Sequence, residues 1–582
     1  MQRFLYRWLV VLIMLIAAYI PSGAQLPFSR YVIELKDKQD NPFRIDHPSD
    51  FLSQRAIERR QRYGIPIDST DLPVTPAYLQ AIAAIPKVSI LNASKWLNQV
   101  LVKIGDSAAL LAIEALPFVK GSSAVAHSAF PNNPDIPEKK QEKWNDSIRR
   151  LPPAEVLSGA YGTHGSMGNS SLSYGSTYGQ IHIHEGEYLH NHGFTGEGMV
   201  IAMLDAGYLF YTTNKALDSA RLQGRILGTW DFVKNEASVT EDDGHGSICL
   251  STMAANIPGK LVGTAPHASF WLLRTEDAGS EYPIELQYWA AGAEYADSAG
   301  ADIISSSLGY TSFDDTSLNL TYAMRDGKTS IATRAANMAF HKGMIVTVSA
   351  GNSGRLLTEY KYVSSPADGD SVLAVGATNP DGVIASFSSW GPNAAGKIKP
   401  DIVSVGQPTV IADIYGNPAT ANGTSVSNPN VCGLIACLWE AFPEFCNRDI
   451  VDAVKRSADR YNQPDGRYGY GIPNFRIAYG LLQYKRDVIA WNGILGPRWI
   501  SANPSPFSND ELRVILKAPH SASASLQLLE ASGRILEALS IKVQEGQTYM
   551  FRFNNSARLA AGIYLIHFND GQQKASLKVM KQ

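Results

Sequence analysis

Three residue types that together turn a hydroxyl group into a nucleophile occur in this chain in the order Asp, His, Ser. Asp205 follows the apolar run 200–204, His245 stands between two glycines, and Ser425 follows a Gly-Thr step. A serine hydroxyl reacts poorly until a base takes its proton; histidine does so near neutral pH, and a carboxylate fixes its tautomer. The set indicates nucleophilic hydrolysis. Taken singly, an Asp after a strand is often a helix cap, and a His between glycines is often part of a turn.

These side chains need a scaffold that brings distant segments together. The continuous apolar run 200–204 predicts a strand buried on both faces of a parallel sheet. Asp205 then lies at the carboxyl end of that strand, where open α/β sheets hold catalytic groups. His245 opens a small-residue helical segment, and Ser425 precedes the apolar stretch 431–442, which predicts a buried helix with a favourable dipole at its N-terminus. We therefore expect an α/β domain with a parallel sheet.

Further motifs stand in a fixed order around these residues. They are Ser306-Ser307-Leu308-Gly309, the segment 346–354 with Asn352 near its end, Phe387-Ser388-Ser389-Trp390-Gly391-Pro392, and Lys399-Pro400-Asp401-Ile402. With them, roughly residues 180 to 485 resemble the subtilisin-like (S8 family) secreted serine peptidases. The resemblance implies that Ser425 is the nucleophile, His245 the general base, Asp205 its orienting partner, and Asn352 an oxyanion donor beside the Ser425 N–H. It also implies that substrate binds along Ser307, Leu308, Gly309, Ser349, Ala350 and Gly351.

The chain departs from the family pattern at three places without losing a catalytic group. Ala206 stands where Thr or Ser is usual, Ser247-Ile248 where Thr-His is usual, and Val426-Ser427-Asn428 where Met-Ala is common. The leading interpretation is a serine endopeptidase. Two alternatives remain open: a non-catalytic cell-surface binding protein with a protease-like body, and a dedicated processing protease.

The first residues predict export. Arg3 and Arg7 precede the apolar stretch 8–20, and small residues lead to Ala24, a pattern typical of a secretory signal peptide. The apolar stretch is short for a membrane span, so we expect removal and no transmembrane anchor in the mature form. The expected localisation is secreted or attached to the cell surface, by way of the periplasm.

Residues 25–160 predict a small α+β unit followed by a linker. Strands are expected at 30–35, 88–93 and 99–104, and helices at 53–63 and 108–116. The unit resembles the propeptide of secreted subtilisin-like enzymes, which implies that it blocks the active site until it is cut; a permanent N-terminal domain is the alternative. The polar, proline-bearing stretch 132–153 is the expected linker for cleavage.

Composition excludes several classes of function. The 51 Lys and Arg residues nearly balance the 54 Asp and Glu residues, so no nucleic-acid partner is indicated. The cysteines (Cys249, Cys432, Cys437 and Cys446) are too few for a disulfide scaffold, although a Cys437–Cys446 pair stays open. The relatives with a free cysteine at the position of Cys249 are the proteinase-K-like ones; a small buried core residue is the plainer interpretation.

Metal sites have weaker signals. The triad chemistry requires no cofactor. A histidine cluster, His182, His184, His190 and His192, has no compact zinc-ligand spacing and predicts a surface helix. Carboxylates at 314, 315 and 326 lie in an insertion, where loop carboxylates can bind calcium. The family resemblance implies a structural calcium somewhere in the chain, with no ligands assigned.

The last eighty residues change character. Short strands are expected at 512–516, 525–529, 548–553, 562–568 and 574–579, with turn signals between them. They predict a small β-sandwich. Together with Asn503-Pro504-Ser505-Pro506-Phe507 and Gly562-Ile563-Tyr564-Leu565, they resemble the C-terminal sorting domain of Bacteroidetes type IX secretion, which implies a secretion-machinery partner; a carbohydrate- or protein-binding sandwich is the alternative. The expected organisation is a signal peptide (1–24), a propeptide-like unit with linker (25–160), a peptidase domain (161–485), a linker (486–500) and a C-terminal sandwich (501–582).

Overall fold

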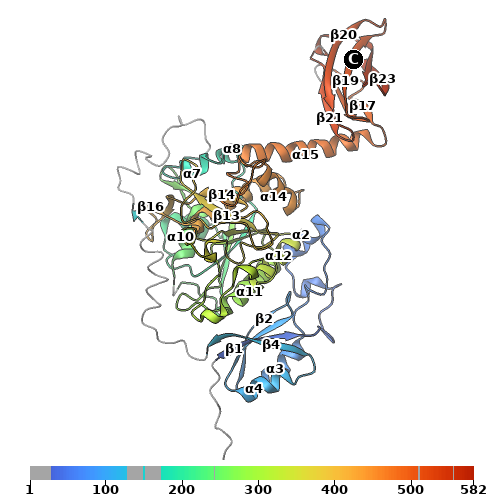
Figure 1. Cartoon of the computed structure of the whole chain (residues 1–582). Helices are drawn as coiled ribbons and strands as arrows, with labels where there is room; N and C mark the ends of the chain where they lie inside the picture. The colour runs from blue at the N-terminus through green and yellow to red at the C-terminus, as the bar shows by residue number, and fades with distance from the viewer. Residues whose placement is uncertain (1–27, 128–148, 151–171, 241–242, 509–511, 555) are drawn as a thin grey trace, which may run out of the picture. The chain divides into compact units, whose positions relative to one another are not determined.

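The computed structural model describes residues 28–127, 149–150, 172–240, 243–508, 512–554 and 556–582. It divides into two compact units, residues 1–479 and 480–582 (Figure 1). The expected signal peptide and most of the expected cleavage linker lie outside the described residues.

A seven-stranded sheet lies at the centre of the first unit. Its order is β14-β13-β12-β11-β6-β10-β7, and neighbouring strands pair in parallel. The strands are β6 (Val200–Asp205), β7 (Ile226–Asp231), β10 (Ser269–Arg274), β11 (Ile303–Ser306), β12 (Ile345–Ser349), β13 (Leu373–Thr378) and β14 (Ile402–Val405). The chain runs from β6 to one edge of the sheet and later, from β11, to the other. Open sheets bind ligands outside the carboxyl ends of strands at such a switch point.

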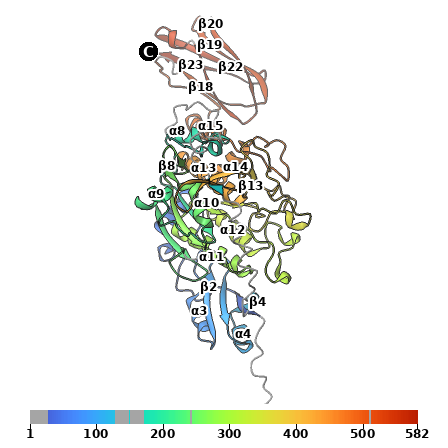
Figure 2. The ribbon, with the colours of Figure 1, turned by 90° about the vertical axis from the view of Figure 1, so that its left-hand side faces the viewer.

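Helices cover both faces of this sheet. In Figure 2, α13 and α14 lie on one side of β13, and α11 and α12 lie on the other. Every residue of β6 is buried, as expected for a strand covered on both faces. The helices that lie on the two faces of the sheet are α10 (His245–Ala254), α11 (Ile284–Ala299), α12 (Ile331–His341), α13 (Thr424–Ala441) and α14 (Asn447–Arg456). The parallel-sheet α/β domain expected from the sequence is confirmed.

The N-terminal unit, residues 28–127, is a four-stranded antiparallel sheet with helices on one face. Its strand order is β2-β3-β1-β4. The elements are β1 (Phe28–Leu35), α2 (Gln54–Tyr63), α3 (Pro76–Ala83), β2 (Val88–Ser94), β3 (Gln99–Ile104), α4 (Ser107–Glu114) and β4 (Val119–His127). One face packs on α3 and α4 through residues such as Ile33, Ile82 and Ile113. The other face, through Val32, Leu101 and Val125, packs on Tyr282, Ile284 and Tyr288 at the start of α11.

Small elements complete the first unit. They are β5 (Arg149–Arg150), α7 (Tyr178–His182), α8 (Glu187–Asn191), α9 (Asp218–Leu222), β8 (Asn256–Ile257), β9 (Leu261–Val262), β15 (Thr409–Ala412) and β16 (Pro418–Ala421). β15, β16 and β5 form a separate three-stranded sheet. Because β16 directly precedes the Ser425 turn, this sheet fixes the approach of the chain to α13.

The C-terminal unit is built of two antiparallel sheets that share one core. The sheets are β17-β18-β21 and β20-β19-β22-β23. The strands are β17 (Ile500–Asn503), β18 (Arg513–Lys517), β19 (Ala522–Glu530), β20 (Ile535–Val543), β21 (Thr548–Arg552), β22 (Gly562–Asn569) and β23 (Lys574–Lys581). Val514 and Leu516 of one sheet and Leu526, Ile566 and Phe568 of the other bury against each other. The sandwich is present as predicted, with β17 and β20 as additional strands.

The expected linker 486–500 is mostly helical. Helix α15 (Phe475–Leu495) crosses the division between the two units. From Gly480 onward the helix belongs to the C-terminal unit, where Asn492 Oδ1 accepts a 2.8 Å hydrogen bond from Thr548 Oγ1. The described helices include none that is long and apolar enough to cross a bilayer.

Candidate active site

Asp205 and His245 form a buried, directly hydrogen-bonded pair. Asp205 is the last residue of β6, and His245 is the first residue of α10. His245 Nδ1 lies 2.6 Å from Asp205 Oδ1, which also accepts the backbone N–H of Ala206 at 2.8 Å. The two side chains are only 1–2% exposed. A carboxylate held in this way fixes the imidazole tautomer and leaves Nε2 as the atom that can take a proton.

The protonated form of His245 is stabilised by its partner. Burial opposes the charged ring, but the Asp205 carboxylate and the Cys249 thiol together outweigh burial, and the pKa of His245 is raised well above its ordinary value of 6.5. The same attraction stabilises the imidazolium that forms when a base accepts a proton from serine. The arrangement is suited to general-base chemistry at alkaline pH.

A close backbone approach holds the two elements together. Gly246 N donates to Gly207 O at 2.9 Å, which ties the first turn of α10 to the loop after β6. A Cβ added at Gly246 would lie 2.6 Å from that same oxygen and 2.7 Å from the Tyr208 ring. A side chain at position 246 would therefore push α10 away and lengthen the Asp205–His245 bond.

Ser425 and Asn352 meet at the N-terminus of α13. Helix α13 begins at Thr424, so Ser425 lies in its first turn, where backbone N–H groups have no partner within the helix. Asn352 Oδ1 accepts both the N–H and the hydroxyl of Thr424 at 2.9 Å. This leaves the Asn352 amide Nδ2 as its donor. A Cβ at Gly423 would lie 2.8 Å from Ser425 Oγ and 3.5 Å from Asn352 Nδ2, so both groups border the same small space.

Within the described ranges, the side-chain hydroxyl of Ser425 makes no hydrogen bond, whereas its backbone is fixed. Ser425 is 2% exposed, and its Oγ has no partner among the described residues. Its backbone is fixed instead: Ser307 Oγ donates to Ser425 O at 2.7 Å, and the Cys249 thiol donates to the same oxygen at 3.2 Å. Cys249 Sγ also lies 3.6 Å from His245 Nε2. Cys249 thus packs against both His245 and Ser425, and burial raises the pKa of its thiol.

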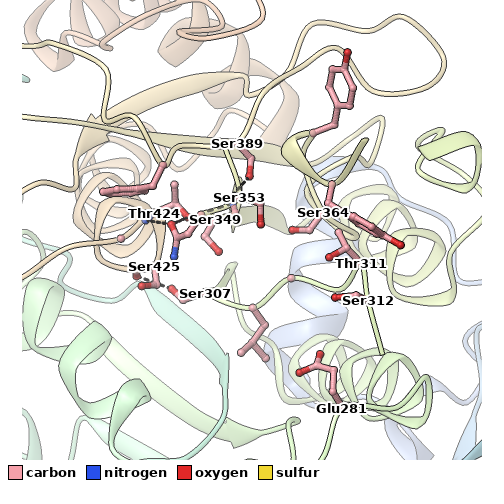
Figure 3. A pocket seen from close by; sticks show the side chains of 18 of the residues that line it. Glu281, Ser307, Thr311, Ser312, Ser349, Ser353, Ser364, Ser389, Thr424 and Ser425 are labelled. Carbon is pink, nitrogen blue, oxygen red and sulfur yellow. Dashed lines mark hydrogen bonds between the residues drawn. The ribbon is translucent and has the colours of Figure 1, made fainter. Parts of the chain in front are cut away.

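A cleft of about 750 Å³ runs from Ser425 along the predicted substrate-binding segments. Its lining includes Ser307, Leu308, Gly309, Ser349 and Gly351; Ala350, predicted with them, is fully buried and does not line it. Figure 3 shows Ser425 and Ser307 close together, with Thr311, Ser312 and Glu281 farther along.

Sequence reasoning missed two residues at this site. Thr424 Oγ1 donates to Asn352 Oδ1 at 2.9 Å and accepts the backbone N–H of Gly351 at 3.1 Å. Ser364 lines the cleft between Gly309 and Gly351, and its hydroxyl has no hydrogen-bond partner among the described residues. Thr424 is adjacent to the serine motif, but no local signal marks Ser364, because it reaches the site through tertiary packing alone.

The unusual residues after Ser425 have structural partners. Ser427 Oγ donates to Gly376 O at 2.6 Å, and Asn428 Nδ2 donates to Ser306 O at 3.1 Å. Both are fully buried. They tie α13 to the carboxyl end of β11 and to the middle of β13, so this departure from the family pattern fastens the helix that presents Ser425.

The histidine cluster is not the predicted surface helix. Only part of it is exposed: His184 and His190 are buried, and burial lowers the pKa of each to about 4. His184 Nε2 lies 2.7 Å from Ser404 Oγ, and His190 Nε2 lies 3.0 Å from Thr264 O. These are neutral core histidines.

The carboxylates considered for calcium have other partners. Asp315 Oδ1 accepts from Ser317 N at 2.9 Å, and Asp326 Oδ1 accepts from Thr329 N at 2.8 Å, so both cap turns. Within the described ranges, the one cluster with metal-ligand geometry is Asp205, His245 and Cys249, which is the site already described. All four cysteines, including Cys437 and Cys446, are free.

The N-terminal unit docks along α11. Glu294 is 6% exposed, and its carboxylate accepts the N–H groups of Lys95 and Trp96 at 2.7 and 3.2 Å. One turn later, fully buried Asp297 pairs with Arg59 and Arg60 of α2. At the other end, His127, the last residue of β4, lies 2.9 Å from Asp315 Oδ2, next to the cleft residue Asp314.

Comparisons with known proteins agree with this geometry. Residues 196–471 match the model of the subtilase family, and residues 30–143 match a peptidase S8 propeptide domain of Bacteroidota. The chain is 30% identical to subtilisin BL of Lederbergia lenta over 293 residues, which are 50% of this chain and 93% of that protein. It is 28% identical to serine protease AprX of Bacillus subtilis over 310 residues, 48% of this chain and 66% of the other.

Solved structures are also similar. The crystal structure of MycP1 from Mycobacterium smegmatis is 19% identical and has a TM-score of 0.42, with 57% of this chain and 88% of that chain covered.

Proposed function

Because the chain belongs to the subtilase family of serine peptidases, we propose that it is a secreted endopeptidase that uses Ser425, His245 and Asp205 to hydrolyse peptide bonds. The observation that carries the proposal is the 2.6 Å bond between Asp205 and His245, beside a cleft that holds both Ser425 and Asn352. A degenerate, purely binding protein has no need for this combination.

The chemistry follows from the positions of the groups. Ser425 Oγ attacks the substrate carbonyl while His245 Nε2 takes its proton, and Asp205 stabilises the resulting imidazolium. The carbonyl oxygen, now negative, accepts hydrogen bonds from Asn352 Nδ2 and from the N–H of Ser425. His245 returns the proton to the leaving amine, and water then releases the acyl group by the same steps. No cofactor is required, and a calcium ion would serve stability only.

Substitution of the nucleophile and of the base tests this function. Ser425→Ala and His245→Ala should each remove peptidase activity on a casein or peptide substrate while the chain still folds, since triad members act as a unit. Thr333→Ser, a change at a buried hydroxyl outside the cleft, is the matched control and should retain activity. A Ser425→Ala protein that turns over substrate at the wild-type rate would overturn the assignment.

We assign the flanking units supporting roles. The N-terminal unit acts as a propeptide that guides folding and inhibits the enzyme, a role supported by the family match over residues 30–143 and by its docking along α11. The C-terminal unit acts as the signal for type IX secretion, supported by its separate core and its sequence resemblance. The protein is then exported through the periplasm to the cell surface or the medium.

A further inference from the structure

Residues 359–364, which we call the wall segment, form part of one wall of the cleft. Tyr360, Tyr362 and Ser364 of this segment line the cleft. The chain enters the segment through an exposed loop, in which Leu357 is 99% exposed. Because the side chains of that loop are not packed against the body, the contacts of the wall segment itself must fix its position.

Ser364 places the wall segment next to the proposed oxyanion donor. A Cβ at Gly351, the residue before Asn352, would lie 3.5 Å from Ser364 Oγ, and a Cβ at Gly309 would lie 2.1 Å from it. This hydroxyl is at the cavity shown in Figure 3 and has no hydrogen-bond partner within the described ranges. Since Asn352 is the proposed donor to the substrate carbonyl, the substrate residues beside that carbonyl lie within reach of the wall segment.

The cleft receives the part of the substrate that precedes the bond. In the proposed reaction His245 returns its proton to the leaving amine, so the residue after the bond must lie beside His245. His245 is not among the lining residues of the cleft in the described ranges, whereas Ser425 and Asn352 are. The cleft therefore receives the residue whose carbonyl is attacked, together with those before it.

Arg325 binds the wall segment from inside the protein. Arg325 is fully buried, and its terminal nitrogens donate to three main-chain carbonyls: Nη1 to Tyr362 O at 2.9 Å and to Val363 O at 3.1 Å, and Nη2 to Glu359 O at 2.9 Å. A guanidinium presents its donors in a rigid planar fork, so one side chain can fix several carbonyls of a turning segment. The backbone of Arg325 is anchored in turn, because Ala394 N donates to Arg325 O at 3.0 Å.

The N–H groups of the wall segment bind elsewhere. Val363 N donates to Trp390 O at 2.8 Å, and Ser364 N donates to Ala350 O at 3.4 Å. Neighbouring backbone thus holds one side of the segment, and Arg325 holds the other through the carbonyls. A side chain without donors at position 325 would leave the carbonyl of the fully buried Val363 without this donor. Since a buried carbonyl that loses its donor is costly, the segment would shift toward water and the wall would lose its fixed position.

We propose that Arg325 is a positioning residue for substrate specificity: it holds the wall segment in the place where its cleft-lining side chains select the residue before the bond that is cut. The proposal rests on the proposed peptidase function and extends it to the choice of substrate. Arg325 is not among the lining residues of the cleft in the described part of the chain, so it acts through the wall segment.

The test separates substrate recognition from the reaction itself. The small ester p-nitrophenyl acetate brings an acyl group without a side chain, so its hydrolysis needs the triad and the oxyanion donors but not the wall. Internally quenched peptides that differ only at the residue before the cut need both. All proteins are first cut by the same added protease, which is then removed.

Arg325→Met keeps the length of the side chain and removes its donors. It should raise the peptide KM by about 10- to 100-fold, the equivalent of one hydrogen bond from a charged donor, because only molecules with the wall in place bind well. The ratio of kcat/KM between the best and the worst peptide should fall toward one. Ester hydrolysis and the rate of fluorophosphonate labelling should stay as in the wild type.

Further variants assign the effect to the wall segment. Arg325→Lys, which keeps a cation with donors, should restore part of the peptide selectivity. Ser364→Ala should change the same peptide ratios, and its effect should be non-additive with that of Arg325→Lys, because both act through one segment. Arg355→Ala is the matched control: it removes an exposed arginine of the preceding loop, outside the cleft, and should leave the ratios unchanged.

The outcomes distinguish the two proposals. Wild-type peptide ratios in Arg325→Met, or equal losses on the ester and the peptides, would overturn the role of Arg325. If Arg325→Met does not fold, Arg325→Lys decides in its place: unchanged ratios, or effects that add to those of Ser364→Ala, would overturn the role. A wild-type enzyme that cleaves no peptide and is not labelled by a fluorophosphonate would instead overturn the proposed peptidase function, and the role of Arg325 with it.

Discussion

Replacing Asp297 should loosen the N-terminal unit from the body that it covers. Asp297, on α11, is fully buried, and its carboxylate pairs with Arg59 and Arg60 of α2, with Lys95 Nζ 3.7 Å away. Burial opposes the charged carboxylate, but Arg60, Lys95 and Arg59 outweigh burial and hold the pKa of Asp297 below its ordinary value. Asp297→Asn keeps the shape of the side chain and removes the negative charge that Arg59 and Arg60 share.

The loss of folding free energy caused by Asp297→Asn can be estimated, because the ion pair is buried. Breaking a buried pair by removing one partner costs about 3–5 kcal/mol, which is about 10²- to 10⁴-fold in an equilibrium constant. Arg60 keeps Asp71 as a partner at 3.0 Å, so we expect the lower half of that range. The matched control is Lys120→Gln, which breaks the pair with Glu34 that is 67% and 38% exposed and should cost about 0–1 kcal/mol.

The assay is urea unfolding of the full chain in a Ser425→Ala background, which prevents self-cleavage. Stability is compared through the midpoint at constant m-value. The pKa of Asp297 is lower in the folded protein than in the unfolded chain, where an aspartate ordinarily titrates near about pH 4. Its contribution to the free energy of unfolding is therefore complete above about pH 4 and is lost as the pH falls through the lowered pKa. The difference in the free energy of unfolding between wild type and Asp297→Asn should therefore become smaller at acid pH. An Asp297→Asn protein as stable as Lys120→Gln at pH 7 would refute this account of the interface.

Four further predictions concern catalysis and maturation. Asn352→Ala should lower kcat by about 10²–10³-fold with little change in KM, the magnitude known from subtilisin itself; an effect on KM alone would make Asn352 merely structural. Since the pKa of His245 is raised and only the neutral ring accepts a proton, kcat/KM should keep rising above pH 6.5, and a pH–rate profile that is already flat there would contradict the pairing. N-terminal sequencing of the secreted, active enzyme should find a terminus between residues 132 and 179; Gln25 as the terminus of fully active enzyme would make the N-terminal unit a permanent domain. Deleting residues 501–582 should trap precursor in the periplasm of the native host while a processed core still hydrolyses peptides, and a truncated chain that reaches the medium would remove the sorting role.

The sequence predicted elements well wherever chemistry or periodicity is local. Val200 to Leu204 reads as a buried strand because every residue is apolar, and β6 has those bounds to within one residue. Ser53 has the residue type of a helix cap, and in the structure it caps α2 by accepting the N–H of Ala56. Asp205 and His245 could be chosen as partners because their flanking motifs carry the family pattern, although 40 positions separate them.

Features set by distant partners were missed. Arg59 and Arg60 belong to the helix predicted at 53–63, but nothing local shows that they are buried; Asp297, more than 230 positions away, makes their burial favourable. His184 looks polar and exposed in sequence, yet it bonds to Ser404 and packs against the Phe475 ring. Residues 486–500 were predicted to be a linker, but most of them are helical in α15. The contact that holds this part of the helix, Asn492 with Thr548, lies 56 positions apart and leaves no local signal. In each case tertiary packing decides what local pattern leaves open.

The measurement that bears most directly on the central claim is the identity of the residue that reacts with a fluorophosphonate. Such a probe labels a serine only when a base and an oxyanion site activate it. Self-processed wild-type enzyme, and His245→Ala protein cut by an added protease that is then removed, are labelled, digested and analysed by peptide mass spectrometry. We predict a single adduct on Ser425 that disappears in the His245→Ala protein. An adduct on another residue, or no adduct on an enzyme that still cleaves peptides, would contradict the account.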